Sequence, residues 1–171
     1  MHTTTAPTLS FGQRLAAFSH LCKPRVNSLI VFTAMIGMCL ATPDFPPLLR
    51  FTVASLGIAL VSFAAAALNC LVERTVDAKM ARTSWRATAR GDISPLETIT
   101  LATALGATGL WLLHNFINDL TVWLTLATFV GYPVIYTLLL KPATPMNIVI
   151  GGASGAMPPI LGWTAMTGQI A

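Results

Sequence analysis

The chain has 171 residues, of which 54% are apolar and only 9% are charged, and its formal net charge is +4. An ordinary soluble domain carries about 25% charged residues, so this chain lacks the polar side chains needed to cover a globular surface in water. The composition excludes a soluble globular protein and predicts a protein whose solvent is largely lipid. The small positive charge is accounted for by membrane topology and indicates no nucleic-acid partner.

The N-terminal region is polar up to residue 9, and no small-residue cleavage site follows a short apolar core, so no cleavable signal is predicted. The next segment, FGQRLAAFSHLC at 11–22, fits two alternatives: an amphipathic helix on the membrane surface or the first turns of the first span. Cys22, Cys39 and Cys70 lack disulfide or metal spacing and are predicted to be small apolar helix residues.

Five apolar runs follow, each close to the roughly 20 residues that cross a bilayer. Pro, Asp, Asn or Arg separates them, and unpaired backbone cannot face lipid, so each run predicts a transmembrane helix. The last run contains GGASGAMPP, whose Gly and Pro are tolerated in spans and whose small residues favour close helix packing. The sequence thus predicts an all-α, polytopic transmembrane helical bundle with about five spans, at about 26–41, 48–72, 96–113, 120–140 and 147–167.

Basic residues alternate between the two sides of these spans. The side with the N-terminus carries nine of them: Arg14, Lys23, Arg25, Arg74, Lys79, Arg82, Arg86, Arg90 and Lys141. The opposite side carries only Arg50. Because short cytoplasmic loops are enriched in Lys and Arg, the N-terminus and the polar loop 73–94 are predicted to be cytoplasmic.

A polar stretch, ALNCLVERTVDAK, ends the second apolar run. Its residues Asn69, Glu73 and Asp77 are four residues apart, which places all three on one face of a helix. Carboxylates at the edge of a membrane usually point into a cavity, and two carboxylates with an amide suit Mg²⁺ whose shell is completed by substrate phosphates. Arg82 and Arg86 follow, and guanidinium groups match phosphate oxygens with paired donors. The stretch therefore predicts a site for a metal-bound diphosphate.

A purely structural interpretation of the same residues is also open. Glu73 and Asp77 could pair with Arg74, Lys79 or Arg82 at a solvated helix end, and the arginines could be topology signals at lipid headgroups. The pattern N-x-x-x-E-x-x-x-D is short, so its spacing alone does not decide between the two interpretations.

Three stretches resemble a known family. NCLVERTVDAKMART, followed by Arg86, resembles the first acidic motif of the UbiA superfamily of intramembrane prenyltransferases, Asn-x-x-x-Asp/Glu-x-x-x-Asp and then Arg-Thr-x-x-Arg. KPRVNSLIVFTAMIGMCLAT at 23–42 and TPMNIVIGGASGAMPPILGW at 144–163 resemble the haem O synthase (protohaem IX farnesyltransferase) branch of that superfamily. The resemblance covers nearly the whole chain from Leu21 onward.

The resemblance implies a membrane enzyme that transfers a farnesyl group from farnesyl diphosphate to a vinyl group of haem b, giving haem O for terminal oxidases. It implies catalytic roles for Asn69, Glu73 and Asp77, with Mg²⁺ as the cofactor held by Glu73 and Asp77 through the diphosphate. It implies the bacterial cytoplasmic (inner) membrane as location, and haem A synthase or oxidase assembly factors as partners. The implied diphosphate-binding residues are Arg82, Arg86, Lys141, Lys23 and Arg25.

The chain also departs from the family pattern. RATARG at 86–91 stands where the family usually reads Arg-Pro-Leu, and Pro142 stands where members often carry Arg. The family has about nine spans and a second acidic motif, whereas the other carboxylates of this chain's later part are isolated at Asp92, Glu97 and Asp119. We therefore expect residues 1–171 to be the N-terminal part of a single prenyltransferase membrane domain.

Two other functions are open at this point. Another member of the superfamily would prenylate an aromatic acid or a quinone precursor, and a pigment extract would then contain a prenylated phenol instead of a prenylated haem. A non-catalytic membrane fragment, either a remnant or a partner in haem or oxidase assembly, would bind prenyl diphosphate weakly and turn nothing over.

Overall fold

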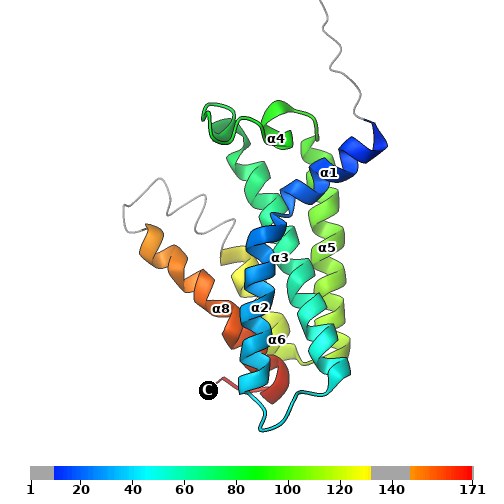
Figure 1. The fold of residues 1–171 in the computed structure, drawn as a ribbon, viewed down its shortest axis with the longest axis vertical. Helices are drawn as coiled ribbons and strands as arrows, with labels where there is room; N and C mark the ends of the chain where they lie inside the picture. Colours follow the sequence, from blue (N-terminus) through cyan, green and yellow to red (C-terminus); the bar gives the residue numbers. More distant parts are fainter. Residues whose placement is uncertain (1–9, 132–146, 171) are drawn as a thin grey trace, which may run out of the picture.

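The computed structural model describes residues 10–131 and 147–170, without the side chains of 147–151, 153 and 154. The described residues form seven helices and no strand, which confirms the predicted all-α fold (Figure 1). The helices are α1 (Phe11–Leu21), α2 (Pro24–Leu40), α3 (Leu48–Asp77), α4 (Ala87–Arg90), α5 (Pro95–Phe116), α6 (Asp119–Val130) and α8 (Asn147–Thr167). The three cysteines are free thiols; Cys39 and Cys70 lie within helices as predicted, whereas Cys22 follows the last residue of α1.

The antiparallel pair α3 and α5 forms the centre of the bundle (Figure 1). Glycines let the two backbones approach: a Cβ added at Gly109 would lie 2.7 Å from the Gly57 carbonyl oxygen and 2.8 Å from a methyl of Val61. Close approach through small residues is how helices pack in lipid, where apolar side chains gain little from leaving the solvent. Both helices are long and apolar enough to cross a membrane.

The second packed pair is α2 and α8. A Cβ at Gly37 would collide with the Pro159 carbonyl, and one at Gly162 would collide with the Ala34 carbonyl. The close contact of α8 is therefore made by Gly162, because a Cβ at Gly152 or Gly155 would meet nothing within 4 Å. Figure 1 shows the N-terminal half of α8 diverging from α2. The four helices α2, α3, α5 and α8 share a hydrophobic core. Its buried residues are Ala34, Met38, Phe51, Ala54, Ile58, Leu113, Leu161 and Ala165.

The helix bounds modify the predicted spans in two respects. The helix predicted over 48–72 continues to Asp77, so the predicted loop 73–94 begins with helical residues. The apolar helices α2 and α6 have only 17 and 12 described residues, and the run predicted at 120–140 ends outside the described ranges. Each of the five apolar helices begins within two residues of its predicted first residue.

Helix α1 is separate from α2, so it does not form the first turns of the next span. Ser10 caps its start through a reciprocal pair of hydrogen bonds with Gln13. The chain then turns at Lys23, whose φ is 46°, and α2 begins at Pro24. Of the two alternatives for this segment, the structure supports a separate helix. Its location on a membrane surface stays a prediction.

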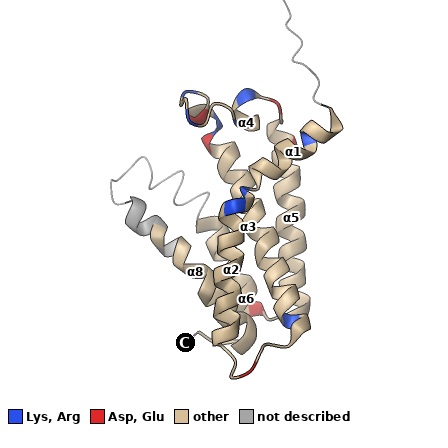
Figure 2. Cartoon of the chain, viewed as in Figure 1, with Lys and Arg blue, Asp and Glu red and all other residues tan. Residues whose placement is uncertain are grey.

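Charged residues lie toward the two ends of the bundle, and most lie toward the end that holds α1, α4 and the last turns of α3 (Figure 2). The apolar middle of α3 and α5 separates this charged end from the end with Arg50, Asp44 and Asp119. The arrangement places the predicted acidic motif at the charged end.

Candidate functional site

The acidic motif lies on the last turns of α3, partly inside the bundle. Asn69 is 2% exposed and Asp77 is 3% exposed, and the Glu73 side chain is 14% exposed. Burying two carboxylates costs several kcal/mol per ion unless a cation and hydrogen bonds compensate. The surrounding structure must therefore supply positive charge.

Arg86 supplies the charge from the segment that follows α3. Its Nη1 lies 2.6 Å from Asp77 Oδ2 and 3.5 Å from Glu73 Oε2, so one guanidinium bridges two carboxylates of successive helical turns. Burial alone would lower the pKa of Arg86, but the hydrogen bond with Asp77 and the nearby acidic groups raise it above its ordinary value. Arg86 therefore stays charged beside the two acids.

The turn after α3 holds this arginine in place. The Thr83 hydroxyl, which is buried, donates to a carbonyl at the end of α3 at 3.3 Å. The Trp85 indole donates to the Arg82 carbonyl at 2.7 Å, and its ring meets the His20 ring edge-on with centroids 6.0 Å apart. The turn is thus anchored to both α3 and α1, which fixes the direction in which the following residue points.

Lys23 approaches the motif from the other side. Its Nζ donates to Asn69 Oδ1 at 2.6 Å. The positive φ of Lys23, rare for a residue with a side chain, costs about 1–3 kcal/mol and persists only where neighbours enforce it. Asn27 is one such neighbour, because its side-chain amide donates to the Cys22 carbonyl while its side-chain oxygen accepts from the Ser62 hydroxyl.

Sequence reasoning missed Asn27 and Ser62. Asn27 is 2% exposed in the middle of an apolar run, and Ser62 sits in the next run. Polar residues inside spans are functional candidates by default, and that signal could have found both. Their partnership could not have been predicted, because they are 35 residues apart.

A pocket of about 370 Å³ opens beside Lys23, between α2, α3, α6 and α8. Asn27, Ser62 and a few threonine hydroxyls line it, but most of its wall is apolar and includes Leu29, Ile30, Ile58, Val61, Phe129 and Leu161. Lys23 both lines this pocket and bonds Asn69, so the pocket and the acidic motif meet at this residue. The arrangement suits a ligand with an anionic head and a hydrocarbon tail.

Other predicted site residues lie apart from this cluster. Arg82 and Arg25 are exposed, and no ion pair of the described residues joins either to the motif. Lys141 lies outside the described residues. The structural alternative, with Arg74, Lys79 or Arg82 pairing with the two acids, is wrong in its partners, because Arg86 takes that place.

The isolated carboxylates each have a local partner. Glu97 pairs with Arg14 of α1, and Asp92 pairs with Arg90. Asp119 lies 2.7 Å from the His114 ring at the opposite end of the bundle. In the described part of the chain these acids are therefore structural and form no second motif.

The acidic motif offers only part of the ligands of a metal ion. No group of three or more His, Cys, Asp and Glu side chains in the described part could hold a metal by itself. Glu73 and Asp77, however, direct oxygens toward one point, now taken by a guanidinium nitrogen. Mg²⁺ commonly takes one or two carboxylates and completes its shell with substrate phosphates and water. The donor set therefore fits a Mg²⁺ shared with a diphosphate.

The helical bundle and its buried acidic motif define a class of intramembrane proteins. The model of the UbiA prenyltransferase family matches residues 30–171, and the chain belongs to this family. The family membership confirms the resemblance found in the sequence and the membrane character of the chain.

Similar proteins narrow the class. The chain is 91% identical over 170 residues to the protoheme IX farnesyltransferase of Dechloromonas aromatica (strain RCB), covering 99% of this chain and 57% of the relative. It is 59% identical over 169 residues to the protoheme IX farnesyltransferase of Aromatoleum aromaticum, covering 98% and 56%. The protein of that name from Thiobacillus denitrificans is 61% identical over 157 residues, covering 92% and 53%. The chain spans about half the length of these curated relatives. No solved structure matches it.

Proposed function

We propose that this chain supplies the diphosphate half of a site that transfers a farnesyl group from farnesyl diphosphate to a vinyl group of haem b, giving haem O. The observation that carries the proposal is the convergence of Lys23 and Arg86 on Asn69, Glu73 and Asp77 at the mouth of an apolar pocket. The name of the relatives, protoheme IX farnesyltransferase, supports the choice of both substrates.

In the proposed reaction the bond between farnesyl C1 and the diphosphate oxygen breaks, and diphosphate leaves with the electron pair. Lys23 and Arg86 neutralise the negative charge that develops on the leaving oxygens. Glu73 and Asp77 would hold Mg²⁺, which would supply Lewis-acid stabilisation of the same charge. Asn69 holds the Lys23 ammonium at 2.6 Å and so orients it toward the leaving group.

The apolar pocket protects the allylic cation from water until the haem vinyl group attacks it. A new carbon–carbon bond then joins farnesyl C1 to the terminal vinyl carbon. Water adds to the adjacent carbon and loses a proton, which completes the hydroxyethyl-farnesyl group. Arg82, Arg25 and Lys141 are proposed to form an outer basic rim for the diphosphate.

We also propose the setting of the reaction. The charged end of the bundle would face the cytoplasm, since nine of the ten basic residues lie on that side of the predicted spans. The membrane would be the bacterial inner membrane, and haem A synthase or oxidase assembly factors would accept the product.

The test uses a chimera in which this chain replaces the matching segment of the Dechloromonas aromatica relative, to which it is 91% identical. The chimera is expressed in a bacterium lacking haem O synthase. The extracted pigments are separated by chromatography and identified by mass spectrometry. We expect haem O from the chimera. Asp77→Asn is expected to lower it by about a hundredfold or more, because the carboxylate that pairs with Arg86 and would help to hold Mg²⁺ on the leaving group is lost.

Asp44→Asn is the matched control, because it makes the same chemical change on an exposed carboxylate at the opposite end of the bundle. If both variants formed as much haem O as the unmodified chimera, the proposed catalytic role of the acidic motif would be wrong. A prenylated phenol with no prenylated haem would assign the chain to the other branch of the superfamily. No prenylated product from a chimera that inserts normally would favour a non-catalytic fragment.

A further inference from the structure

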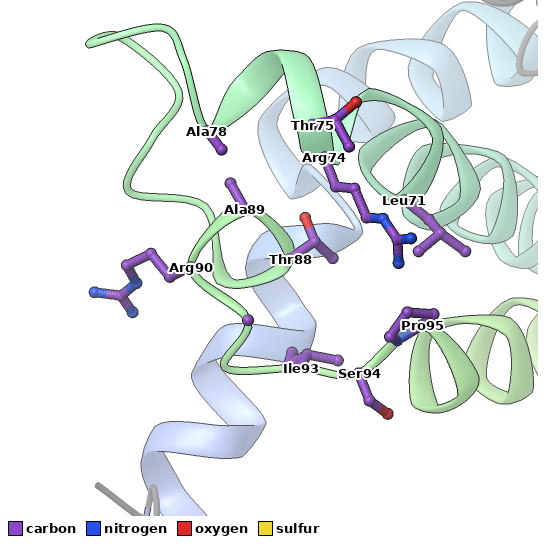
Figure 3. Close-up of a pocket in the computed structure, with 11 residues that line it drawn as sticks. Leu71, Arg74, Thr75, Ala78, Thr88, Ala89, Arg90, Ile93, Ser94 and Pro95 are labelled. Carbon is purple, nitrogen blue, oxygen red and sulfur yellow. The ribbon is translucent and has the colours of Figure 1, made fainter. Parts of the chain in front are cut away.

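A second pocket, of about 460 Å³, lies at the charged end of the bundle and has no part in the proposed reaction. The end of α3, the residues of α4 and the start of α5 line this open, solvent-facing pocket, and Figure 3 shows its lining residues. It lies away from the acidic motif. On α3 its residues Leu71, Arg74, Thr75 and Ala78 are centred about 150° around the helix axis from Asn69, Glu73 and Asp77, at about 100° per residue.

Arg74 is the charged group of this pocket. Figure 3 shows its guanidinium inside the pocket, between Leu71 and Thr88 and facing Pro95. It makes no ion pair with any described residue, in contrast to Arg86 on the other side of α3. A guanidinium offers five N–H donors in a fixed plane and matches phosphate oxygens with two of them.

The rest of the lining adds no negative charge. Thr75, Thr88 and Ser94 line the pocket, and no acidic residue does. The Thr88 hydroxyl donates to the Cys70 carbonyl, and the Ser94 hydroxyl accepts from the Glu97 backbone N–H. Arg90 stands at the far rim, where its side chain is 56% exposed and paired with Asp92, and its guanidinium points outward (Figure 3). The pocket therefore carries a net positive charge from Arg74, an exposed residue, because Asp92 neutralises Arg90 at the rim.

The apolar residues in and beside the pocket indicate that the anionic ligand also has a hydrocarbon part. Ile93 and Pro95 line the pocket next to the polar groups. Immediately beyond them on α5, Leu96 is 73% exposed and Ile99 is 46% exposed, as expected of side chains that face lipid. The pocket thus lies between an exposed cation, Arg74, and an exposed apolar surface. Basic pockets between transmembrane helices at the membrane edge are the usual receptors of anionic headgroups.

We propose that this pocket binds a phosphate group through Arg74. The phosphate would be that of an anionic lipid headgroup whose acyl chains lie along Leu96 and Ile99, and free phosphate is the other source of the same chemistry. A bound lipid would tie the ends of α3 and α5 together on the face opposite the acidic motif. The inference does not depend on the proposed farnesyl transfer, because it concerns binding alone.

The experiment measures binding to the purified chain in a neutral detergent by native mass spectrometry. The probes are short-chain phosphatidylglycerol, short-chain phosphatidylcholine and inorganic phosphate. We expect phosphatidylglycerol to bind most tightly, and Arg74→Gln to weaken its binding by roughly fivefold or more, the effect of one basic residue at a membrane surface. Arg90→Gln is expected to weaken it less, because this guanidinium points away from the pocket.

Arg50→Gln is the matched control, since it removes the same charge from the opposite end of the bundle. Ala89→Leu narrows the pocket without changing charge and is expected to weaken binding as Arg74→Gln does. Inorganic phosphate that binds with the same dependence on Arg74 and displaces the lipid would identify free phosphate as the source. Equal binding of phosphatidylglycerol by the Arg74, Ala89 and Arg50 variants, or no binding of any probe, would overturn the proposal.

Discussion

Lys23 shows how a single backbone conformation positions a charge. Its positive φ turns the chain between α1 and α2 and sends the ammonium toward Asn69 instead of along the helix axis. The turn has no glycine to make it inexpensive, so other groups must enforce it. Asn27 does so from the first turn of α2, through the hydrogen bond from its amide to the Cys22 carbonyl. A residue that contacts neither acid thus determines where the lysine points.

Replacement of Asn27 by Leu tests this role. The change leaves the part-buried Cys22 carbonyl and Ser62 hydroxyl without their present partner, and each loss costs about 1 kcal/mol. We expect the KM of the chimera for farnesyl diphosphate to rise roughly tenfold while the KM for haem b stays unchanged.

Thr33→Val is the control for that change. Thr33 lines the same pocket, but its hydroxyl donates only to carbonyls of its own helix, at Leu29 and Ile30. We expect both KM values to stay as they are. An equal rise of both KM values in the Asn27 variant would mean that the bundle is loosened and that Asn27 has no specific effect on Lys23.

At the residue scale, sequence spacing predicts one part of the site well. The four-residue spacing places Asn69, Glu73 and Asp77 on one face because α3 continues through all three. Arg86 lies close enough in the chain to fold back on that face. The contribution of Lys23 through Asn69 joins residues 46 positions apart, and only the packing of α2 on α3 brings them together.

Among the helices, the pairing of α3 with α5 forms the frame on which the site stands. Leu21, Cys70, Ala87, Ile93 and Ala102 pack together just beneath the charged end, so any shift of α5 moves the turn that carries Arg86. The pair is held together by close backbone contact at Gly57 and Gly109, where a side chain has no room. Packing of this kind is sensitive to a single methyl group.

Gly109→Ala tests the close contact. The added methyl would meet the Gly57 carbonyl oxygen at 2.7 Å, and backbone cannot move aside as a flexible side chain can. Overpacking of this kind costs about 1–3 kcal/mol. We expect the melting temperature of the chain in detergent to fall by roughly 3–10 °C, measured by circular dichroism.

The control is Gly152→Ala in α8, where the added methyl would meet nothing within 4 Å. Because alanine is the better helix former, we expect no fall and at most a slight rise in melting temperature. A similar fall in both variants would contradict the role of the contact with Gly57, because Gly152→Ala makes no such contact and improves helix propensity.

The helix starts follow from the sequence because caps and prolines mark them. Ser94 with Glu97 forms a capping box ahead of α5, and Pro24 stands at the first position of α2. The end of α3 is marked less clearly, because the apolar run stops at Val72 while the spacing of Glu73 and Asp77 predicts helix through Asp77, where α3 ends. Arg86 neutralises Glu73 and Asp77 from outside the helix.

For the whole molecule, the division into a charged end and an apolar body sets where chemistry is possible. The motif, the Arg74 pocket and most of the basic residues lie at one end (Figure 2), while the apolar pocket reaches from Lys23 into the body. This polarity was predictable from the alternation of basic residues along the chain. The pocket was not, because its wall combines residues from four helices.

The central claim is that this chain holds a prenyl diphosphate through its acidic motif. The most direct measurement is the binding of farnesyl diphosphate to the purified 171-residue chain in detergent, with and without Mg²⁺, by titration calorimetry. We predict saturable binding that requires Mg²⁺, is weakened roughly tenfold or more by Asp77→Asn and is unchanged by Asp44→Asn. Binding of equal strength in both variants, or binding indifferent to Mg²⁺, would contradict the account.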